Sequence, residues 1–457
     1  MSHIINYRLN QFSWAVAAVL LLPLLFTQGM FFDGLTFAAI ARNLNEGVGQ
    51  FWSPQYTPFV HPEYYEHPPF SFAIHSIYYR LFGDQPWVDR FYAYTLYGLS
   101  ILMIRRIWAL LIPSGHRGWI PQLLWTLTPT VLWVHQNNLL EAPLNAATLA
   151  VVWLLIEGTW KKNYLWSALA GVLFFLALGI KGPVALFPLM VLPLVAVLFK
   201  EYRSNALISL VVMVLSSSVL FSFFYTYEPD FAKFFEGYLN QQLLPSLRGL
   251  RGTESSVLLS LGELAKQLAL PVLVLILLAW RRGNSYPLRR ESIFMFCIAI
   301  CATLPFLFLH RQEHYYFMPS MAFWMLAFGM LYEQAPWPWG INRKRWVKYI
   351  SLTNLGLWSI AIILTLYFSK SPSRDKHTIK AYRSMANDLD LQVIQVYDLN
   401  DFWKDNAIAS RYHKLYLTEN DQPYLLTRLD DAVPDGFVIE TVFEKAELVL
   451  YKKATPE

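Results

Sequence analysis

Two acidic motifs follow the first long apolar run of the sequence and place carboxylates where a membrane-spanning segment would end. Asp33 lies in Phe31–Gly34, and Glu66 lies in Tyr65–Pro69, in front of two prolines that fix the backbone. A carboxylate at the edge of an apolar span is costly unless it is solvated or used, and carboxylates serve as general acids and bases. The motifs therefore predict acid–base chemistry at a membrane surface, with His67 as a further group that could carry a proton or contact a phosphate.

Each of these two acids also has a purely structural interpretation. Asp33 could be the N-cap of a following helix, a role that aspartate fills well. Glu66 could be an ordinary solvated acid of a loop. The residues alone leave both alternatives open.

Two more charged groups interrupt the apolar pattern further along the chain. Glu141 follows the polar run 135–138 and could line a site or simply cap a helix that begins at Pro143. Lys181 joins two apolar runs with almost no linker. A lysine at such a position either snorkels to the interface or binds an anion, and we favour the anion.

Two connections between apolar runs are rich in hydrogen-bond donors that could bind a charged substrate. The candidates are Arg248 and Arg251 in the segment 226–261, and Arg311, His314 and Tyr316 in the connection 310–319. Each is a weak signal by itself, because charged residues are common in exposed loops.

The composition decides which class of protein must position these groups. Of the 457 residues, 55% are hydrophobic and only 15% are charged, whereas a typical soluble domain carries about 25% charged residues. The chain is therefore predicted to be an all-α polytopic membrane protein. Apolar runs long enough to cross a bilayer occur about eleven times. They lie at 12–32, 88–104, 118–134, 142–158, 164–180, 183–199, 205–225, 262–280, 291–309, 315–333 and 347–368.

The placement of lysine and arginine predicts the orientation of these spans. Alternate connections are basic, as the positive-inside rule requires of cytoplasmic loops. They contain Arg105, Arg106, Arg117, Lys161, Lys162, Lys200, Arg203, Arg281, Arg282, Arg289, Arg290, Arg343, Lys344, Arg345 and Lys348. This puts the N-terminus inside, the C-terminus outside and every candidate group above on the external face. The net charge of +5 then reflects anchoring at the inner leaflet, and no basic–aromatic stripe suggests nucleic-acid binding.

The polar segments divide the chain into a membrane domain, 1–368, and an external α/β domain, 369–457. The membrane domain carries external loops at about 33–90 and 226–261. Within the first loop we expect an amphipathic helix at 34–44 lying at the interface, and a helix at 70–82 that starts after Pro68-Pro69 and ends at Gly83. In the C-terminal domain we expect a helix at 376–389, a strand at 391–396 and a hairpin at 436–451.

Five motifs in this order resemble the GT-C class of glycosyltransferases that use lipid-linked sugars. They are Asp33-Gly34, Glu66–Pro69, Glu141–Leu144, Lys181–Leu186 and Tyr316–Pro319. The branch most similar to this chain contains the lipid A aminoarabinose transferase and the protein O-mannosyltransferases of the glycosyltransferase family 39 type. The likeness covers about residues 12–335 and also the position of the external domain.

The resemblance implies a sugar donor on a polyprenyl phosphate and an acceptor that reaches the outer membrane surface. It implies catalytic roles for Asp33 and Glu66, with Asp33 taking the proton of the acceptor hydroxyl and the anomeric carbon inverting. The leaving phosphate would be met by cations. The residues expected to bind substrate are His67, Glu141, Lys181, Arg248, Arg251, Arg311, His314 and Tyr316. A glycine-rich nucleotide loop is neither needed nor found, and no cofactor is expected.

Three departures from the family pattern concern the same site. Gly34 stands where many relatives have a second acid, His67 replaces a lysine, and Glu141 stands where aspartate is frequent. A divalent ion held by oxygen atoms of Asp33 and Glu66 is conceivable. Two acids and a histidine at unknown distances do not establish such a site, so we predict no metal.

The expected setting is a bacterial inner membrane, with the C-terminal domain in the periplasm. The acceptor is expected to be a glycolipid or another envelope glycan, with a protein as the less favoured choice, and a monomer could suffice. A glycan or phosphoglycan ligase would share this architecture. Two alternatives outside this class are a transporter or flippase of lipid-linked glycans and a non-catalytic subunit for envelope assembly.

Overall fold

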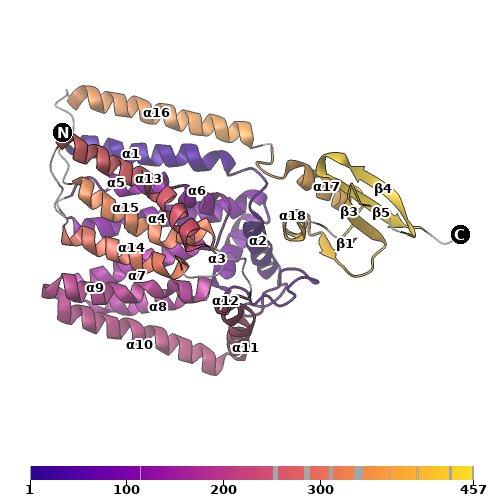
Figure 1. Cartoon of the computed structure of the whole chain (residues 1–457), viewed down its shortest axis with the longest axis horizontal. Coiled ribbons are helices and arrows are strands. Elements are labelled where there is room, and N and C mark those ends of the chain that lie inside the picture. The colour runs from indigo at the N-terminus through magenta and orange to yellow at the C-terminus, as the bar shows by residue number, and fades with distance from the viewer. Residues whose placement is uncertain are drawn as a thin grey trace.

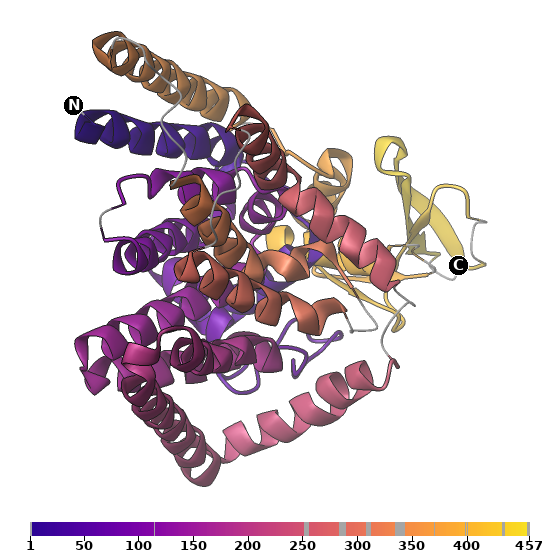
Figure 2. The same ribbon diagram turned by 60° about the vertical axis from the view of Figure 1, so that its left-hand side comes forward.

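The computed structural model consists of a bundle of long helices with a small sheet-containing unit at one end (Figure 1). Seen from a second direction, the sheet still lies beyond the same end of the bundle (Figure 2). The structure describes residues 2–113, 115–250, 256–282, 289–307, 312–333, 343–369, 371–397, 399, 401–431 and 435–454.

The bundle is built from helices that are apolar over most of their length. Its long helices are α1 (Ser2–Leu21), α4 (Pro86–Leu111), α7 (Glu141–Lys161), α8 (Tyr164–Lys181), α10 (Arg203–Tyr227), α13 (Val257–Arg282), α14 (Arg290–Leu307), α15 (Met318–Glu333) and α16 (Arg343–Phe368). Shorter ones are α5 (Trp119–Thr126), α6 (Pro129–Gln136) and α9 (Val191–Leu198). Among the described residues, 7 helical stretches are long and apolar enough to cross a membrane. The helical membrane architecture is thus confirmed, and the number of eleven spans stays a prediction.

The first helix ends earlier than the apolar run predicted. α1 stops at Leu21 instead of reaching residue 32, and Pro23 occupies the short 3-10 turn η1 (Leu22–Leu24) that follows. Proline cannot donate the backbone hydrogen bond that a continuing α-helix needs. Asp33 therefore lies in the first turn of a separate helix, α2 (Phe32–Asn45), and not at the mouth of the first span.

A buried arginine organises the break between α1 and α2. The guanidinium of Arg90 donates hydrogen bonds to the backbone carbonyls of Leu24 (2.9 Å), Thr27 and Gly29 (2.5 Å). It also donates to the carbonyl of Gln136 (2.9 Å), at the end of α6. These carbonyls replace the water that a buried cation would otherwise need, so one side chain fixes two chain breaks at the same place.

The stretch 164–198 forms a helical hairpin, in which α8 and α9 run in opposite directions. Lys181, at the end of α8, pairs with Glu141 at the start of α7. Trp160, near the other end of α7, stacks on Tyr202 at a centroid distance of 4.4 Å. The chain therefore reverses between α8 and α9. The reversal occurs at Gly182 (φ 62°), which opens the 3-10 segment η2 (Gly182–Met190).

Four helices lie at the end of the bundle nearest the sheet: α2, α3 (Phe70–Phe82), α11 (Pro229–Tyr238) and α12 (Leu244–Leu247) (Figure 1). α3 has the predicted bounds and ends at Gly83 (φ 77°). α2 also forms where predicted, but it is buried along most of its length and not laid on an interface. Phe37 packs in the bundle core whereas Leu35 packs in the core of the C-terminal unit, so α2 has protein on opposite faces.

The C-terminal unit is a five-stranded sheet with the helices α17 (Lys376–Asn387) and α18 (Phe402–His413). The strands are β1 (Val393–Val396), β2 (Tyr416–Thr418), β3 (Tyr424–Arg428), β4 (Phe437–Phe443) and β5 (Leu448–Lys453), in the order β2-β1-β3-β5-β4. β1 pairs in parallel with β2 and β3, and β5 pairs antiparallel with β3 and β4. The structure thus contains the predicted first helix, first strand and closing hairpin. α18, β2 and β3 were not anticipated.

A buried ion cluster joins α18 to the bundle. Arg411 of α18 donates to Asp84 (2.7 Å) and Asp89 (3.0 Å), and its guanidinium lies 5.1 Å from the ring centroid of Tyr79. The side chains of Arg411 and Asp89 are 2% and 0% exposed. Buried ions are tolerated only when they are paired, so this contact holds the C-terminal unit in one place on the bundle.

We expect Arg411→Met to lower the free energy of unfolding by about 3–5 kcal/mol, because it leaves the buried carboxylate of Asp89 without its cation. Lys414→Met is the matched control, since the ion pair of Lys414 with Glu46 is largely exposed and such pairs contribute little. Thermal unfolding of the purified protein in detergent measures both. Equal small shifts for the two variants would contradict the structural role of the cluster.

Candidate active site

Asp33 lies where the start of α2 meets the bundle. Its Oδ2 accepts a hydrogen bond from the hydroxyl of Tyr315 (3.3 Å), which belongs to the 3-10 segment η5 (His314–Phe317). Just before Asp33, the backbone N–H of Phe31 donates to Oδ1 of Asn137 (2.7 Å), in the connection that leads to α7. An acid in the first turn of a helix is also favoured by the helix dipole.

Gly34 explains why only one acid stands at this position. A Cβ atom at residue 34 would lie 1.7 Å from the backbone oxygen of Asn137, far inside van der Waals contact. The side-chain amide of Asn138 donates to the carbonyl of Gly34 (3.3 Å) and holds the two backbone segments together at this point. The second acid found in relatives therefore cannot be accommodated here without moving the backbone that supports Asp33.

Glu141 and Lys181 form a second charged group at the same end of the bundle. The ammonium of Lys181 donates to Oε1 of Glu141, and its Nζ lies 4.7 Å from the ring centroid of Tyr316. The two side chains are 12% and 3% exposed. Glu141 is the first residue of α7, so the helix does not begin at Pro143 as one interpretation had it. The anion bound by Lys181 is therefore a carboxylate of the protein itself, that of Glu141.

Tyr315 and Tyr316 connect Asp33 to the Glu141–Lys181 pair. Tyr315 donates a hydrogen bond to Asp33, and the ammonium of Lys181 lies over the ring of Tyr316. The ring centroids of the two tyrosines are 5.1 Å apart. Sequence reasoning identified Tyr316 by resemblance and missed Tyr315. The signal was present as two consecutive tyrosines in a short connection, but which ring faced an acid could not be read from spacing.

The other predicted residues surround this centre at different distances. His314 packs edge-on against Trp133 (centroids 5.5 Å apart). The ring of His67 lies edge-on to that of Phe37, with centroids 5.6 Å apart. Phe37 is one turn along α2 from Asp33. Glu66 is half-buried beside it in the sequence. The contact with Phe37 brings His67 to α2, whereas a site shared by Glu66 and Asp33 stays a prediction.

The three predicted arginines are not part of the contacts just described. Arg248 is exposed at the end of α12. Arg251 and Arg311 lie outside the residues that the structure describes.

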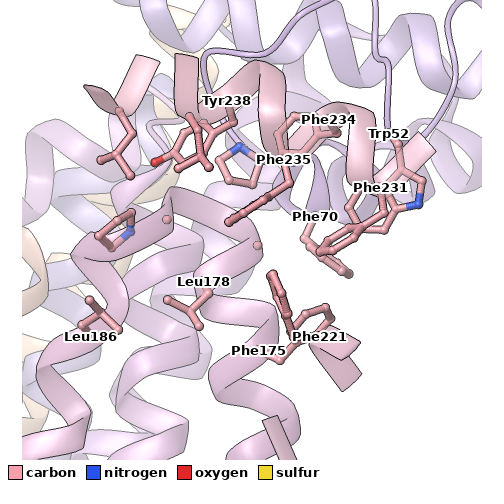
Figure 3. A pocket seen from close by; sticks show the side chains of 16 residues that line it. Trp52, Phe70, Phe175, Leu178, Leu186, Phe221, Phe231, Phe234, Phe235 and Tyr238 are labelled. Atoms are coloured by element: carbon pink, nitrogen blue, oxygen red, sulfur yellow. The ribbon is translucent and has the colours of Figure 1, made fainter. Parts of the chain in front are cut away.

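An apolar cavity of about 250 Å³ opens beside Lys181. Gly179, Gly182 and Pro183, which flank the lysine in sequence, form part of its wall. Figure 3 shows aromatic side chains of α11 on one side and Phe175 and Phe221 on the other. The wall of this cavity can hold hydrocarbon and offers almost no hydrogen bonds. Lys181 and Glu141 are not among the residues that line it, although Gly182, the residue after Lys181, is.

Within the part of the chain that the structure describes, no three histidine, cysteine, aspartate or glutamate side chains come together as a metal site. The absence of an ion shared by Asp33 and Glu66 stays a prediction.

Comparison with known proteins agrees with this architecture. Residues 66–226, about a third of the chain, match the family model described as dolichyl-phosphate-mannose-protein mannosyltransferase. No curated protein matches the chain. ArnT from Cupriavidus metallidurans bound to undecaprenyl phosphate is similar over 96% of this chain and 97% of its own, with a TM-score of 0.65 and 15% identity. AglB, an archaeal oligosaccharyltransferase from Archaeoglobus fulgidus in complex with an inhibitory peptide and a dolichol-phosphate, is similar over 92% of this chain and 69% of its own (TM-score 0.52, 11% identity).

At such identities the likeness shows the fold. The chain has the fold of the GT-C glycosyltransferases, as the five motifs predicted. The matched family segment contains the Glu66, Glu141 and Lys181 motifs, whereas Asp33 and Tyr316 lie outside it.

Lys181→Ala should lower the thermal stability of the protein, because Glu141 is left buried without a cation. Adding Glu141→Gln to that variant should recover part of the loss, since the amide carries no charge. Lys233→Ala, which breaks the exposed pair with Glu63, is the control and should change little. A double variant as unstable as the sum of its two single variants would show that the two side chains are not coupled.

Proposed function

We propose that this chain is a membrane glycosyltransferase that moves a sugar from a polyprenyl-phosphate carrier to an acceptor at the external face of the membrane. The observation that carries the proposal is the meeting of Asp33 with the Glu141–Lys181 pair at two adjacent tyrosines, beside an apolar cavity. A base, a cation and a hydrocarbon pocket are what transfer from a lipid phosphate requires. The GT-C fold and the matched family segment support the same class of reaction.

In the proposed reaction the acceptor hydroxyl attacks the anomeric carbon of the donor. Asp33 takes the hydroxyl proton as the new bond between the acceptor oxygen and the anomeric carbon forms. The bond between that carbon and the phosphate oxygen breaks, and its electron pair leaves with the polyprenyl phosphate. A single displacement from the opposite side inverts the anomeric carbon. Tyr315, which donates to Asp33, would hold the carboxylate in the orientation of attack.

The cavity is proposed to hold the polyprenyl chain next to its phosphate. Its wall of aromatic and aliphatic side chains suits an isoprenoid, because burial of apolar surface is favourable and non-directional. Lys181 directly precedes Gly182 of this wall in the chain, and an ammonium has three N–H donors. One donor faces Glu141, and the others could meet the leaving phosphate.

The remaining predicted residues keep their proposed roles around this centre. Glu66 would assist Asp33, and His67 would contact the donor from the α2 side. Additional positive charge for the phosphate would come from residues of the two donor-rich connections. These are Arg248, Arg251, Arg311 and His314, with Tyr316 beneath the lysine.

We further propose the setting expected from the sequence. The membrane domain, 1–368, would cross a bacterial inner membrane eleven times, with the unit 369–457 in the periplasm. A glycolipid or envelope glycan is the favoured acceptor. A transporter would be expected to place its polar groups near the bilayer midplane. Here Asp33 lies in the first turn of α2, a helix at the end of the bundle nearest the sheet (Figure 1), and Tyr315 and Tyr316 link it to Lys181, which favours the enzyme.

Asp33→Asn should reduce sugar transfer by about 10²–10⁴-fold, the usual loss when a general base is removed. The assay uses purified protein in detergent, a panel of radiolabelled polyprenyl-phosphate sugars and an envelope lipid extract, with release of polyprenyl phosphate as the readout. Asp230→Asn is the matched control, because Asp230 is an exposed acid in the first turn of α11. Transfer by Asp33→Asn at the wild-type rate would refute the assigned base.

A further inference from the structure

The segment before Asp33 is bound by the C-terminal unit. The backbone N–H of Gly29 donates to the hydroxyl of Tyr412 in α18 (2.8 Å). The hydroxyl of Ser373, in the chain leading to α17, donates to the carbonyl of Gly29 (3.0 Å), and its backbone N–H donates to Gln28 (2.8 Å). The polar backbone groups of this segment are therefore satisfied by residues more than three hundred positions away in sequence.

The bundle holds the same segment from the other side. Arg90 donates to the carbonyl of Gly29 that Ser373 also contacts. Gly29 has φ 92°, and a Cβ atom there would lie 2.4 Å from the backbone oxygen of Arg374. The close approach of the two chains thus requires glycine. Residue 29 is fixed between the bundle and the C-terminal unit.

Apolar contacts on both sides of Asp33 belong to the C-terminal unit as well. Met30 and Leu35 are fully buried in the core that contains Ile379 and Tyr382. The residue immediately before α2, Phe31, has the guanidinium of Arg374 over its ring (5.8 Å). Met30 and Leu35, on either side of Asp33 in the sequence, are therefore core residues of a unit formed at the far end of the chain, whereas Phe31 packs against the bundle core.

The other end of α2 is fixed by the same helix of that unit. Arg42 is 1% exposed and donates to the carbonyls of Ser410 (2.8 Å) and Arg411 (3.1 Å), in the last turn of α18. Carbonyls in the last turn of a helix lack some of the intrahelical donors available further back. That of Ser410 also accepts from the backbone N–H of Lys414 (3.2 Å), so Arg42 adds donors at the C-terminal end of α18. Tyr412 and Arg42 together tie α18 to both ends of α2.

We infer that the C-terminal unit positions the catalytic carboxylate, with Tyr412 and Ser373 as positioning residues. The inference rests on the proposed function of Asp33. The carboxylate contacts Tyr315 of the bundle, whereas the backbone that carries it is fastened to α18 and to the chain before α17. Because turnover is sensitive to small displacements of a reacting group, loosening this attachment slows the chemical step and leaves substrate binding intact.

The test compares two tyrosine-to-phenylalanine variants of the full-length protein in the transfer assay. Tyr412→Phe removes the hydroxyl that accepts from Gly29, and kcat is expected to fall about 10-fold with KM for donor and acceptor unchanged. Tyr382→Phe keeps the ring in the core but removes another buried hydroxyl of the same unit, one that faces Asp405 of α18, and it is expected to keep kcat within about 2-fold. Ser373→Ala is expected to act in the direction of Tyr412→Phe.

Hydrogen exchange of the amides 28–33 gives a second readout that needs no substrate. Exchange in this segment is expected to rise in Tyr412→Phe and to stay unchanged in Tyr382→Phe. Wild-type kcat in Tyr412→Phe, or equal losses in both variants, would overturn the positioning role while Asp33-dependent transfer still stood. If the wild-type protein transferred no sugar at all, the proposed function would fail, and unchanged exchange at 28–33 would then separately overturn the attachment.

Discussion

The arrangement of the site depends on the buried guanidinium of Arg90. It donates hydrogen bonds to backbone carbonyls in the break between α1 and α2 and at the end of α6. α2 begins with Asp33 in its first turn, and the chain after α6 leads directly to Glu141. A cation in an apolar bundle needs hydrogen-bond acceptors. The acceptors of Arg90 are backbone carbonyls at the two chain breaks that precede Asp33 and Glu141. The starting points of both acid-bearing helices are thereby fixed relative to each other.

The sequence predicted the regular parts of this molecule well, because hydrophobic length and helix punctuation are local properties. α3 between Pro69 and Gly83 is a clear case, and the first strand and closing hairpin of the C-terminal unit are others. The run 12–32 was misjudged because hydropathy alone does not register where Pro23 ends a helix. The ordered motifs placed Lys181 and Tyr316 among the expected substrate-binding residues, and these two side chains are in contact.

What the sequence could not reveal are pairings between distant polar residues. No sequence pattern singled out Arg90 or Arg411, yet both are buried. Lys181 was expected to bind an anion, and its partner is the carboxylate of Glu141 at the start of the preceding helix, α7. Tyr315 became visible only when η5 was placed against α2. Each of these contacts depends on tertiary placement, which no periodicity encodes.

A single physical rule accounts for where the proposed chemistry is located. Inside an apolar bundle every charge needs a partner, and partners are most available where helices end and backbone groups are free. At the end nearest the sheet, the two parts of the molecule supply partners to each other. Arg42 of α2 donates to a carbonyl of α18, and Arg411 of α18 donates to Asp89 of the bundle, while Arg90 donates to Gln136 within the bundle. Groups held by several partners lose little freedom when a substrate arrives, and such preorganisation is what transfer to an acceptor would exploit. The same packing removes space for a second acid at Gly34, so the fixed backbone that orients Asp33 also leaves it the only carboxylate at the start of α2.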